Sequence, residues 1–199
     1  MASGRAGTDD WVVHKFGGSS VADADCLARV AGIIERDPRR RVAVVLSACK
    51  GVTDALLELV ALAERRDALV GASLDALRAR HAGIAGTLLS AEGARAYREE
   101  LEHDCSDIAG ILQTVALIRA AARNILDLVA GYGEIWSTRL YAALLRERRA
   151  RDPVLWLDAR QVVVVEWGPL GPTVQWQESQ AKLAQLVPAE FAGTLVITS

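Results

Sequence analysis

The pattern of hydrophobic and polar positions predicts strands that are separated by helices. Residues 11–16 form a short β-rich run ending at two glycines, and residues 42–46 are apolar without alternation, as in a central strand covered on both faces. Between these runs, apolar residues recur at helical spacing as far as Asp37 and Pro38, where the proline ends the helix. Further strands are expected over residues 154–157, 162–165 and 194–198.

Helical periodicity dominates the middle of the chain. Helices are expected over residues 53–66, 73–130, 134–149 and 177–186. One long apolar stripe runs from Ile108 to Val129, and the glycines and prolines of residues 168–172 predict a turn or loop. The alternation of strands and helices favours an α/β fold with helical layers around a mainly parallel sheet.

Composition and charge exclude several classes of protein. Of the 199 residues, 51% are hydrophobic, and 23 Lys and Arg face 25 Asp and Glu. This composition does not fit a disordered chain, and the balanced charge offers no basic stripe for nucleic acid and no polybasic membrane anchor. Charged residues interrupt every hydrophobic stretch, so no membrane span is expected. Residues 1–10 are small and polar and are predicted to be a disordered tail, and a cytoplasmic location with reduced thiols is expected.

The first candidate site is the run KFGGSS, where a strand turns into a helix. Gly17 and Gly18 allow the backbone to approach a ligand closely, and Lys15 supplies a positive charge facing the same turn. Ser19 and Ser20 can cap the helix or add hydroxyl contacts. The run therefore describes a phosphate cradle, although its spacing is not that of a Walker A loop. The alternative is an ordinary Gly-Gly turn with a surface lysine.

Two further candidates follow along the chain. Ser47 and Thr53 lie in the loop after the second strand, at the same sheet edge as Lys15 if the two strands are neighbours. Thr53 is also a candidate helix N-cap. Residues 131–134 (GYGE) are expected to end one helical region and open another, with Glu134 in a first helical turn. Such a carboxylate either caps the helix electrostatically or receives a substrate ammonium group.

Other polar residues suggest structural roles. The three histidines are too scattered for a metal site, and strand alternation points His14 and Lys15 to opposite faces, so His14 is expected to be a packing residue. Asp158 and Arg160 follow a strand and are expected to form a local ion pair, with a ligand role as the alternative. Cys49 is expected to be a buried or half-buried thiol without a catalytic role.

Three stretches together resemble the aspartate kinase family, in that family's order. They are VHKFGGSSVAD (residues 13–23), VVLSACKGVTD (44–54) and GYGEIWSTRL (131–140). The chain is thus similar to the N-terminal part of an aspartate kinase. Residues 156–183 also resemble bifunctional forms in which the kinase is fused to a diaminopimelate decarboxylase.

The resemblance implies a fold and a reaction. Residues 11–199 would form the N-terminal part of an amino-acid-kinase domain, a three-layer αβα sandwich with a mainly parallel sheet. Such enzymes transfer the γ-phosphoryl group of MgATP to the side-chain carboxylate of L-aspartate. The product, 4-phospho-L-aspartate, begins the synthesis of lysine, threonine and methionine.

The same resemblance implies roles for individual residues. Lys15 would hold the transferring phosphoryl group, beside the backbone amides of Gly17 and Gly18, with Ser19 in the same cradle. The expected aspartate contacts are Ser47, Thr53 and, for the α-ammonium group, Glu134. Mg²⁺ would arrive with ATP and be held largely by phosphate oxygens, so no protein metal ligand is expected.

Several alternatives stay open. The chain ends within an apolar strand, before the Gly-rich block that supplies much of the nucleotide pocket in the family, so the isolated chain is expected to be inactive. A related kinase with another acceptor, such as glutamate, is a second interpretation. A non-catalytic aspartate-binding or assembly module is a third, and a homo-oligomer is compatible with all of them. A dinucleotide-binding domain is disfavoured, because no G-x-G-x-x-G follows the first strand.

Overall fold

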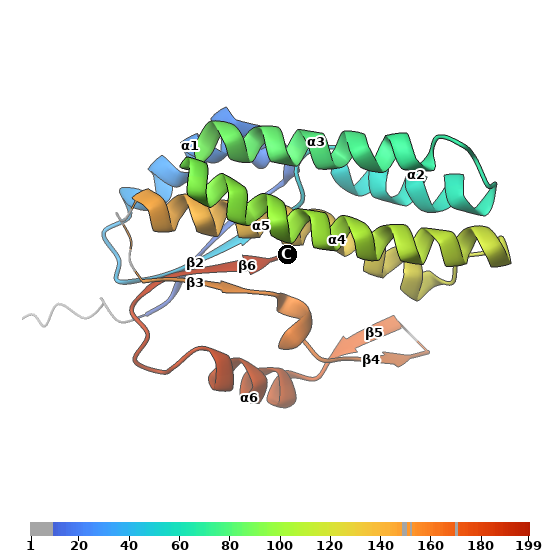
Figure 1. Ribbon diagram of the computed structural model, residues 1–199. Helices are drawn as coiled ribbons and strands as arrows, with labels where there is room; N and C mark the ends of the chain where they lie inside the picture. The colour runs from blue at the N-terminus through green and yellow to red at the C-terminus, as the bar shows by residue number, and fades with distance from the viewer. Residues whose placement is uncertain (1–9, 149–150, 152, 170) are drawn as a thin grey trace, which may run out of the picture.

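The computed structural model describes residues 10–148, 151, 153–169 and 171–199, which form a layered α/β arrangement (Figure 1). The elements in chain order are β1 (Val12–Phe16), η1 (Gly18–Val21), α1 (Ala24–Glu35), β2 (Arg41–Leu46), α2 (Val52–Glu64), α3 (Val70–Leu88), α4 (Ala91–Ile118), α5 (Arg123–Arg148), β3 (Val154–Leu157), η2 (Ala159–Gln161), β4 (Val165–Gly168), β5 (Gly171–Val174), α6 (Trp176–Leu186) and β6 (Gly193–Thr198).

The main sheet has four parallel strands in the order β1-β2-β6-β3. The two central strands, β2 and β6, are buried at most positions and half-buried at the others, which explains why their sequences are apolar without alternation. Strand β1 lies at an edge and alternates between half-buried and exposed positions. The predicted α/β class with a mainly parallel sheet is confirmed.

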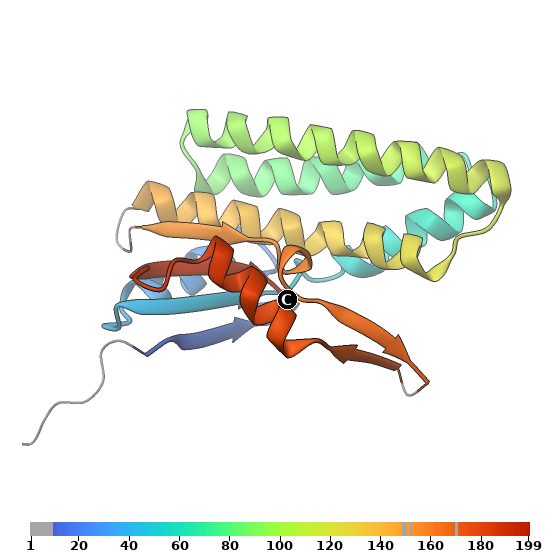
Figure 2. The ribbon, with the colours of Figure 1, turned by 90° about the horizontal axis from the view of Figure 1, so that it is seen from below.

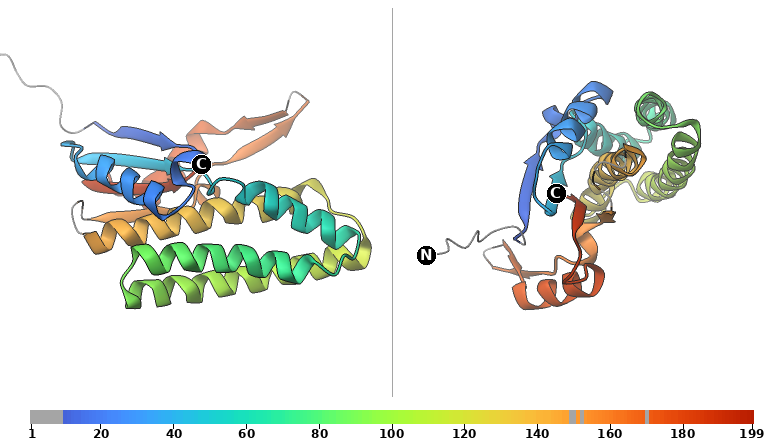
Figure 3. Two further views of the ribbon diagram at one scale, coloured as in Figure 1. Left: turned by 90° about the horizontal axis from the view of Figure 1, so that it is seen from above. Right: turned by 90° about the vertical axis from the view of Figure 1, so that its left-hand side faces the viewer.

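Helices cover the two faces of this sheet unequally. Helices α1 to α5 lie on one side, with α3 and α4 paired outside α2 and α5, whereas α6 lies on the other side (Figures 1 and 3). The view from below shows α6 across the sheet and the β4–β5 hairpin extending beyond it (Figure 2). In the described part of the chain, no helix is both long and apolar enough to cross a membrane.

Helix α5 lies at the centre of the hydrophobic core. Its Trp136 and Tyr141 are among the largest fully buried side chains, together with Leu27 of α1, Leu46 of β2 and Leu56 of α2. Full burial of one large apolar side chain contributes about 1.5–3 kcal/mol. The core therefore fixes α5 against the sheet and against α1 and α2.

The single helical region expected over residues 73–130 is divided into several helices, which the sequence pattern does not predict. Residues 73–130 fall into α3, α4 and the start of α5, with a break at Arg119, whose φ of 56° is left-handed. The apolar stripe expected from Ile108 to Val129 consequently belongs to two helices.

The expected helix start at residues 131–134 is wrong, because α5 already begins at Arg123. Gly133 of this stretch allows close packing instead of ending a helix. A Cβ on Gly133 would lie 2.9 Å from the Cβ of Ala48, so a larger residue could not approach the β2–α2 loop in the same way. Glu134 thus lies inside a long helix and not in its first turn.

The strand expected over residues 162–165 is also wrong, since β4 begins at the last of these residues. Val162 instead follows the turn η2 and is buried in a small cluster with Leu157 and Leu195. Burial of Val162 in this cluster overrides the strand propensity of that residue. In the stretch expected to be a turn or loop, residues 168–172, Gly168 pairs with Gly171 across the antiparallel β4–β5 hairpin, and residue 170 lies outside the described residues.

A buried carboxylate anchors the connection between α1 and β2. Asp37, whose side chain is 3% exposed, accepts hydrogen bonds from Nε of Arg39 at 2.7 Å and from its Nη2 at 2.7 Å. Nε2 of His14 lies 2.7 Å from the same carboxylate. His14, expected to be a packing residue, stacks on Phe16 and also contacts the carboxylate of Asp37.

We expect stability to depend on Asp37 in acid. Hydrogen bonding to Arg39, with a smaller contribution from His14, holds the pKa of Asp37 well below its ordinary value despite burial. A lowered pKa in the folded state stabilises the protein above the unfolded-state pKa, so this contribution is lost as the pH falls below about 4. Urea denaturation should show a smaller decrease in unfolding free energy between about pH 5 and pH 2 for Asp37→Asn than for the wild type. Equal decreases would contradict this assignment.

Candidate functional site

The parallel register aligns the carboxyl ends of the central strands. The backbone N–H of Ser47 donates to the carbonyl of Phe16 at 3.1 Å, and that of Ser199 donates to the carbonyl of Leu46 at 3.2 Å. The strand ladder therefore continues by one residue beyond β2 and β6. Two serine hydroxyls stand next to each other at this edge, where ligands of open α/β sheets usually bind.

These hydroxyls connect a cation to a carboxylate. Nζ of Lys15 donates to Oγ of Ser47 at 3.0 Å, and Oγ of Ser47 lies 3.4 Å from Oγ of Ser199. Oγ of Ser199 donates to Oε1 of Glu134 at 2.6 Å. We call these four residues the polar row. It brings together three of the residues that the sequence singles out.

Glu134 reaches this edge because α5 packs closely on the β2–α2 loop. A Cβ on the preceding Gly133 would lie 3.1 Å from Cγ1 of Val52, and Oγ of Ser137 donates to the carbonyl of Ser47 at 2.8 Å. Burial raises the pKa of Glu134, while the hydrogen bond from Ser199 and the charge of Lys15 oppose that rise. The half-buried carboxylate is suited to bind a cationic ligand group.

The two glycines after β1 have different surroundings. A Cβ on Gly18 would lie 2.8 Å from the carbonyl oxygen of Ala48, and the N–H of Lys50 donates to the carbonyl of Gly18 at 3.1 Å. Gly18 is therefore needed for contact between the two loops. A Cβ on Gly17 would meet no heavy atom within 4 Å, so that side of the turn is open to a ligand.

The capping roles expected for the serines and for Thr53 are wrong. Ser19 and Ser20 lie in η1, and α1 is capped by Asp23, which accepts from the N–H of Cys26 at 2.8 Å. Helix α2 has Gly51 at its N-cap position.

Ser19 and Thr53 are both exposed at this end of the molecule. Among the hydrogen bonds of the described residues, none joins either of them to the polar row. Their predicted ligand contacts stay predictions.

A cavity of about 210 Å³ lies beside Glu134. Its lining includes Ser199 and the pair Asp158 and Arg160, which follows β3. Nε of Arg160 is 2.9 Å from Oδ2 of Asp158 and Nη2 is 2.6 Å from it, so the expected local ion pair is confirmed. The cavity has room for a small polar ligand at the carboxylate end of the row.

Potential metal ligands and cysteines are the other chemical groups that the described residues contain. Within residues 10–148, 151, 153–169 and 171–199, no three His, Cys, Asp or Glu side chains are grouped so as to hold a metal ion. Burial raises the pKa of Cys49 to about 11, as expected of an inert buried thiol.

Sequence reasoning missed Ser199, Ser137 and the packing role of Gly133. Ser199 could have been found by the rule that selected Ser47, because each is the first residue after a buried central strand. The contact of Ser137 with a loop 90 residues earlier in the chain has no signal in the local sequence.

The fold, the candidate site and the sequence together define the protein family to which the chain belongs. The family model of the amino acid kinase family matches residues 10–198, and the chain belongs to this family. Its relatives include bifunctional aspartokinase/homoserine dehydrogenase 1, chloroplastic, of Zea mays, which is 34% identical over 193 residues. Lysine-sensitive aspartokinase 3 of Escherichia coli (strain K12) is 35% identical over 189 residues. The matches cover 96% and 94% of this chain, but 20% and 39% of the respective relatives.

Solved aspartokinase structures share the fold. Escherichia coli aspartokinase III in complex with lysine and aspartate (T-state) superposes with a TM-score of 0.77 at 32% identity, covering 94% of this chain and 40% of that chain. The same enzyme in complex with aspartate and ADP (R-state) gives a TM-score of 0.73 at 32% identity, covering 95% and 40%. The bifunctional relative from maize carries a homoserine dehydrogenase, and fusion to a diaminopimelate decarboxylase stays a prediction.

The two glycines give a matched test of the loop contact. We expect Gly18→Ala to lower the unfolding free energy by about 1–3 kcal/mol, because its Cβ collides with a backbone oxygen. Gly17→Ala, at φ −80° and with open space around it, should stay within about 0.5 kcal/mol of the wild type. Chemical denaturation measures both, and equal losses would contradict the role assigned to Gly18.

Proposed function

We propose that this chain provides the L-aspartate-binding and phosphate-binding part of an aspartate kinase. The supporting observation is the polar row, in which two hydroxyls separate the Lys15 cation from the Glu134 carboxylate. The complete activity would be transfer of the γ-phosphoryl group of MgATP to the side-chain carboxylate of L-aspartate.

The carboxylate end of the row suits the amino group of an amino acid. An ammonium group can pair with Glu134, while the hydroxyls of Ser47 and Ser199 can donate to or accept from polar groups beside it. The cavity next to Glu134 leaves space for such a ligand. Both solved structures of Escherichia coli aspartokinase III are described as bound to aspartate, and one of them also as bound to lysine. Aspartate is the amino acid common to both, which favours it as the substrate.

The cationic end of the row suits a phosphoryl group. Lys15 is exposed at the end of β1, and the open side of Gly17 allows a bulky anion to approach the backbone. We assign Lys15, Gly17, Gly18 and Ser19 to the phosphates of ATP. One structural relative is described as bound to ADP, which favours a nucleotide as the phosphoryl donor.

The chemistry assigned to these residues is positioning and charge neutralisation. When bound, MgATP supplies the phosphoryl group, and Mg²⁺ offsets phosphate charge. Glu134 would hold the amino group of aspartate so that the side-chain carboxylate faces Lys15, and Lys15 would stabilise the negative charge of the transferring group. Phosphoryl transfer depends mainly on such alignment and electrostatic stabilisation.

Three further parts of the proposed function do not depend on the contacts of the polar row. Thr53 stays a predicted aspartate contact, and a location in the cytoplasm also stays a prediction. So does the expectation that the isolated chain binds aspartate without turning over. ADP release by the isolated chain that depends on L-aspartate would overturn that last expectation.

Glu134 is expected to control aspartate binding in a pH-dependent way. Glu134→Gln should weaken L-aspartate binding about tenfold or more at neutral pH, because it removes the charge paired with the ammonium group. Burial raises the pKa of Glu134, so its carboxylate takes up a proton at a higher pH than an ordinary glutamate, whose pKa is about 4.3. Binding to the wild type should weaken with that protonation. Calorimetric titrations between about pH 7.5 and pH 5 should show this dependence in the wild type and a flat profile in Glu134→Gln.

The control for this experiment is Glu99→Gln, which changes an exposed carboxylate on α4 that pairs with Arg95 and lies outside the contacts around Glu134. Its affinity should equal that of the wild type at every pH. Unchanged affinity in Glu134→Gln would remove the support for the ammonium site, and tighter binding of L-glutamate than of L-aspartate would favour a kinase with a different acceptor.

Lys15 is expected to act in the chemical step. In the full-length protein, Lys15→Ala should lower kcat about a hundredfold or more while changing the KM for aspartate little, because the lost charge serves the transferring phosphoryl group. Aspartate-dependent ADP release from MgATP measures both constants. The matched control is Lys182→Ala on α6, whose ammonium group pairs with Glu178. A rise in KM with unchanged kcat would contradict the role given to Lys15.

A further inference from the structure

The backbone at Glu134 is held by hydroxyl side chains of the next helical turn. Oγ1 of Thr138 donates to the carbonyl oxygen of Glu134 at 2.7 Å, and Oγ of Ser137 lies 3.1 Å from the same oxygen. Both residues are fully buried. The single hydroxyl proton of Ser137 is shared between the carbonyls of Ser47 and Glu134. Thr138 therefore makes the shorter hydrogen bond to the carbonyl of Glu134.

The hydroxyl of Thr138 is itself oriented by a residue of the sheet. Nε1 of Trp156, on β3, donates to Oγ1 of Thr138 at 2.9 Å. With an acceptor position of this oxygen occupied, the hydroxyl proton is directed towards the carbonyls of α5, where Glu134 at 2.7 Å is closer than Ile135 at 3.2 Å. Hydrogen bonds in such a chain strengthen one another.

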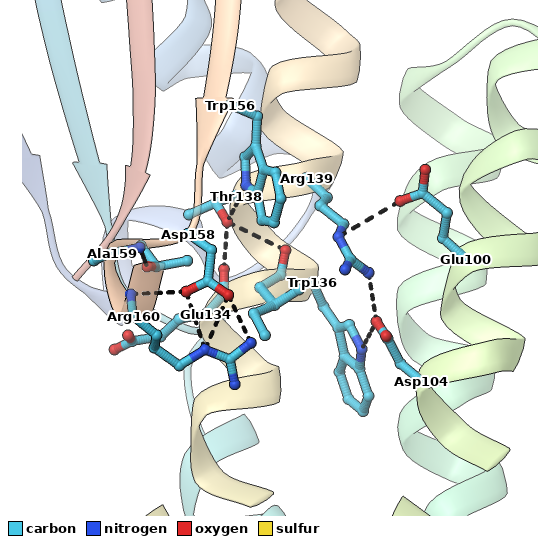
Figure 4. Close-up of polar contacts among 12 residues, drawn as sticks. Glu100, Asp104, Glu134, Trp136, Thr138, Arg139, Trp156, Asp158, Ala159 and Arg160 are labelled. Atoms are coloured by element: carbon cyan, nitrogen blue, oxygen red, sulfur yellow. Dashed lines mark hydrogen bonds and ion pairs between the residues drawn. The ribbon is translucent and has the colours of Figure 1, made fainter. Parts of the chain in front are cut away.

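The indole of Trp156 is fixed in turn by a partly buried ion pair. The guanidinium of Arg139 lies 5.1 Å from the centre of its ring, and Nη1 of Arg139 is 2.6 Å from Oδ2 of Asp104. Nε1 of Trp136 also donates to Asp104 at 3.1 Å. Figure 4 shows the resulting sequence of contacts, from Asp104 on α4 through Arg139 and Trp156 to Thr138 and the helical turn of Glu134.

We propose that Trp156 is a positioning residue for Glu134 and acts through the hydroxyl of Thr138. Strand β3 lies next to β6, and Trp156 is in register with Val196 of that strand. The sheet thereby holds both ends of Glu134: its carboxylate through Ser199 after β6, and its backbone through Trp156 on β3. Trp156 fixes the direction in which the carboxylate meets its ligand. The consequence for aspartate binding rests on the proposed function.

The first test needs no ligand. Trp156→Phe keeps an aromatic face for Arg139 but removes the indole N–H. A displaced Glu134 loses part of its hydrogen bond from Ser199, which favours the ionised form, so the pKa of Glu134 should rise in this variant. Carboxyl ¹³C NMR titration of the ligand-free protein measures that pKa. An unchanged pKa in Trp156→Phe would overturn the proposal whether or not the protein binds aspartate.

The route through Thr138 is tested with a second set of variants. Thr138→Val, which removes the hydroxyl, should raise the pKa of Glu134 as Trp156→Phe does, and Thr138→Ser should restore it. The double variant Trp156→Phe/Thr138→Val should match Thr138→Val alone, because the indole acts through that hydroxyl. Additive shifts would show that Trp156 acts by another path, which contradicts the proposal. The control Trp167→Phe, in the exposed β4–β5 hairpin, should leave the pKa unchanged.

The second readout connects the network with the proposed function. The Kd for L-aspartate should rise about three- to tenfold in Trp156→Phe, as expected for the loss of one positioning hydrogen bond. Thermal unfolding should be recorded for each variant, since a purely structural role would lower Tm without changing the Kd or the pKa of Glu134. A wild-type protein that does not bind L-aspartate would refute the proposed function, whereas the pKa measurement would still decide the positioning role.

Discussion

The parallel register of the sheet is the constraint on which the candidate site depends. Because β1, β2 and β6 run in the same direction and end side by side, the residues that follow them meet at one edge. A one-residue change of register would reverse the faces of all side chains in a strand. Ser47 and Ser199 extend the ladder by their backbone N–H groups, so the interactions that build the sheet also place the two hydroxyls. The site follows directly from strand pairing.

Close packing of helix α5 supplies the carboxylate of the site, which no strand of the sheet carries. Glu134 belongs to α5, and its carboxylate reaches the strand ends because Gly133 allows the helix backbone to approach Ala48 and Val52. Ser137 then ties the helix to the carbonyl of Ser47. A helix with a larger residue at this position would stand further from the loop. The glycine therefore acts through the distance between two elements, and not through backbone flexibility.

The sequence predicts the central strands and the residue types of the site better than it predicts where the helices begin and how the segments between strands fold. The central strands are identifiable because burial on both faces leaves continuous apolar runs, and the places of Lys15, Ser47 and Glu134 relative to strands and glycines indicate them as candidates. The pattern nevertheless predicts a helix start at Glu134, because glycines that end a helix and glycines that permit packing look alike in sequence. Val162 lies outside a strand because its burial in a small cluster is a tertiary effect that the local sequence does not show.

The order of groups in the polar row explains how opposite charges can remain available at one site. A direct ion pair between Lys15 and Glu134 would satisfy both charges and leave little for a ligand. Each serine hydroxyl can accept a hydrogen bond on one side and donate on the other, so the row runs from the Lys15 ammonium through Ser47 and Ser199 to the carboxylate. The hydroxyls keep the charges apart, and Coulomb attraction weakens with distance. A ligand that carries a cation and an anion can then replace part of this internal pairing without leaving either charge uncompensated.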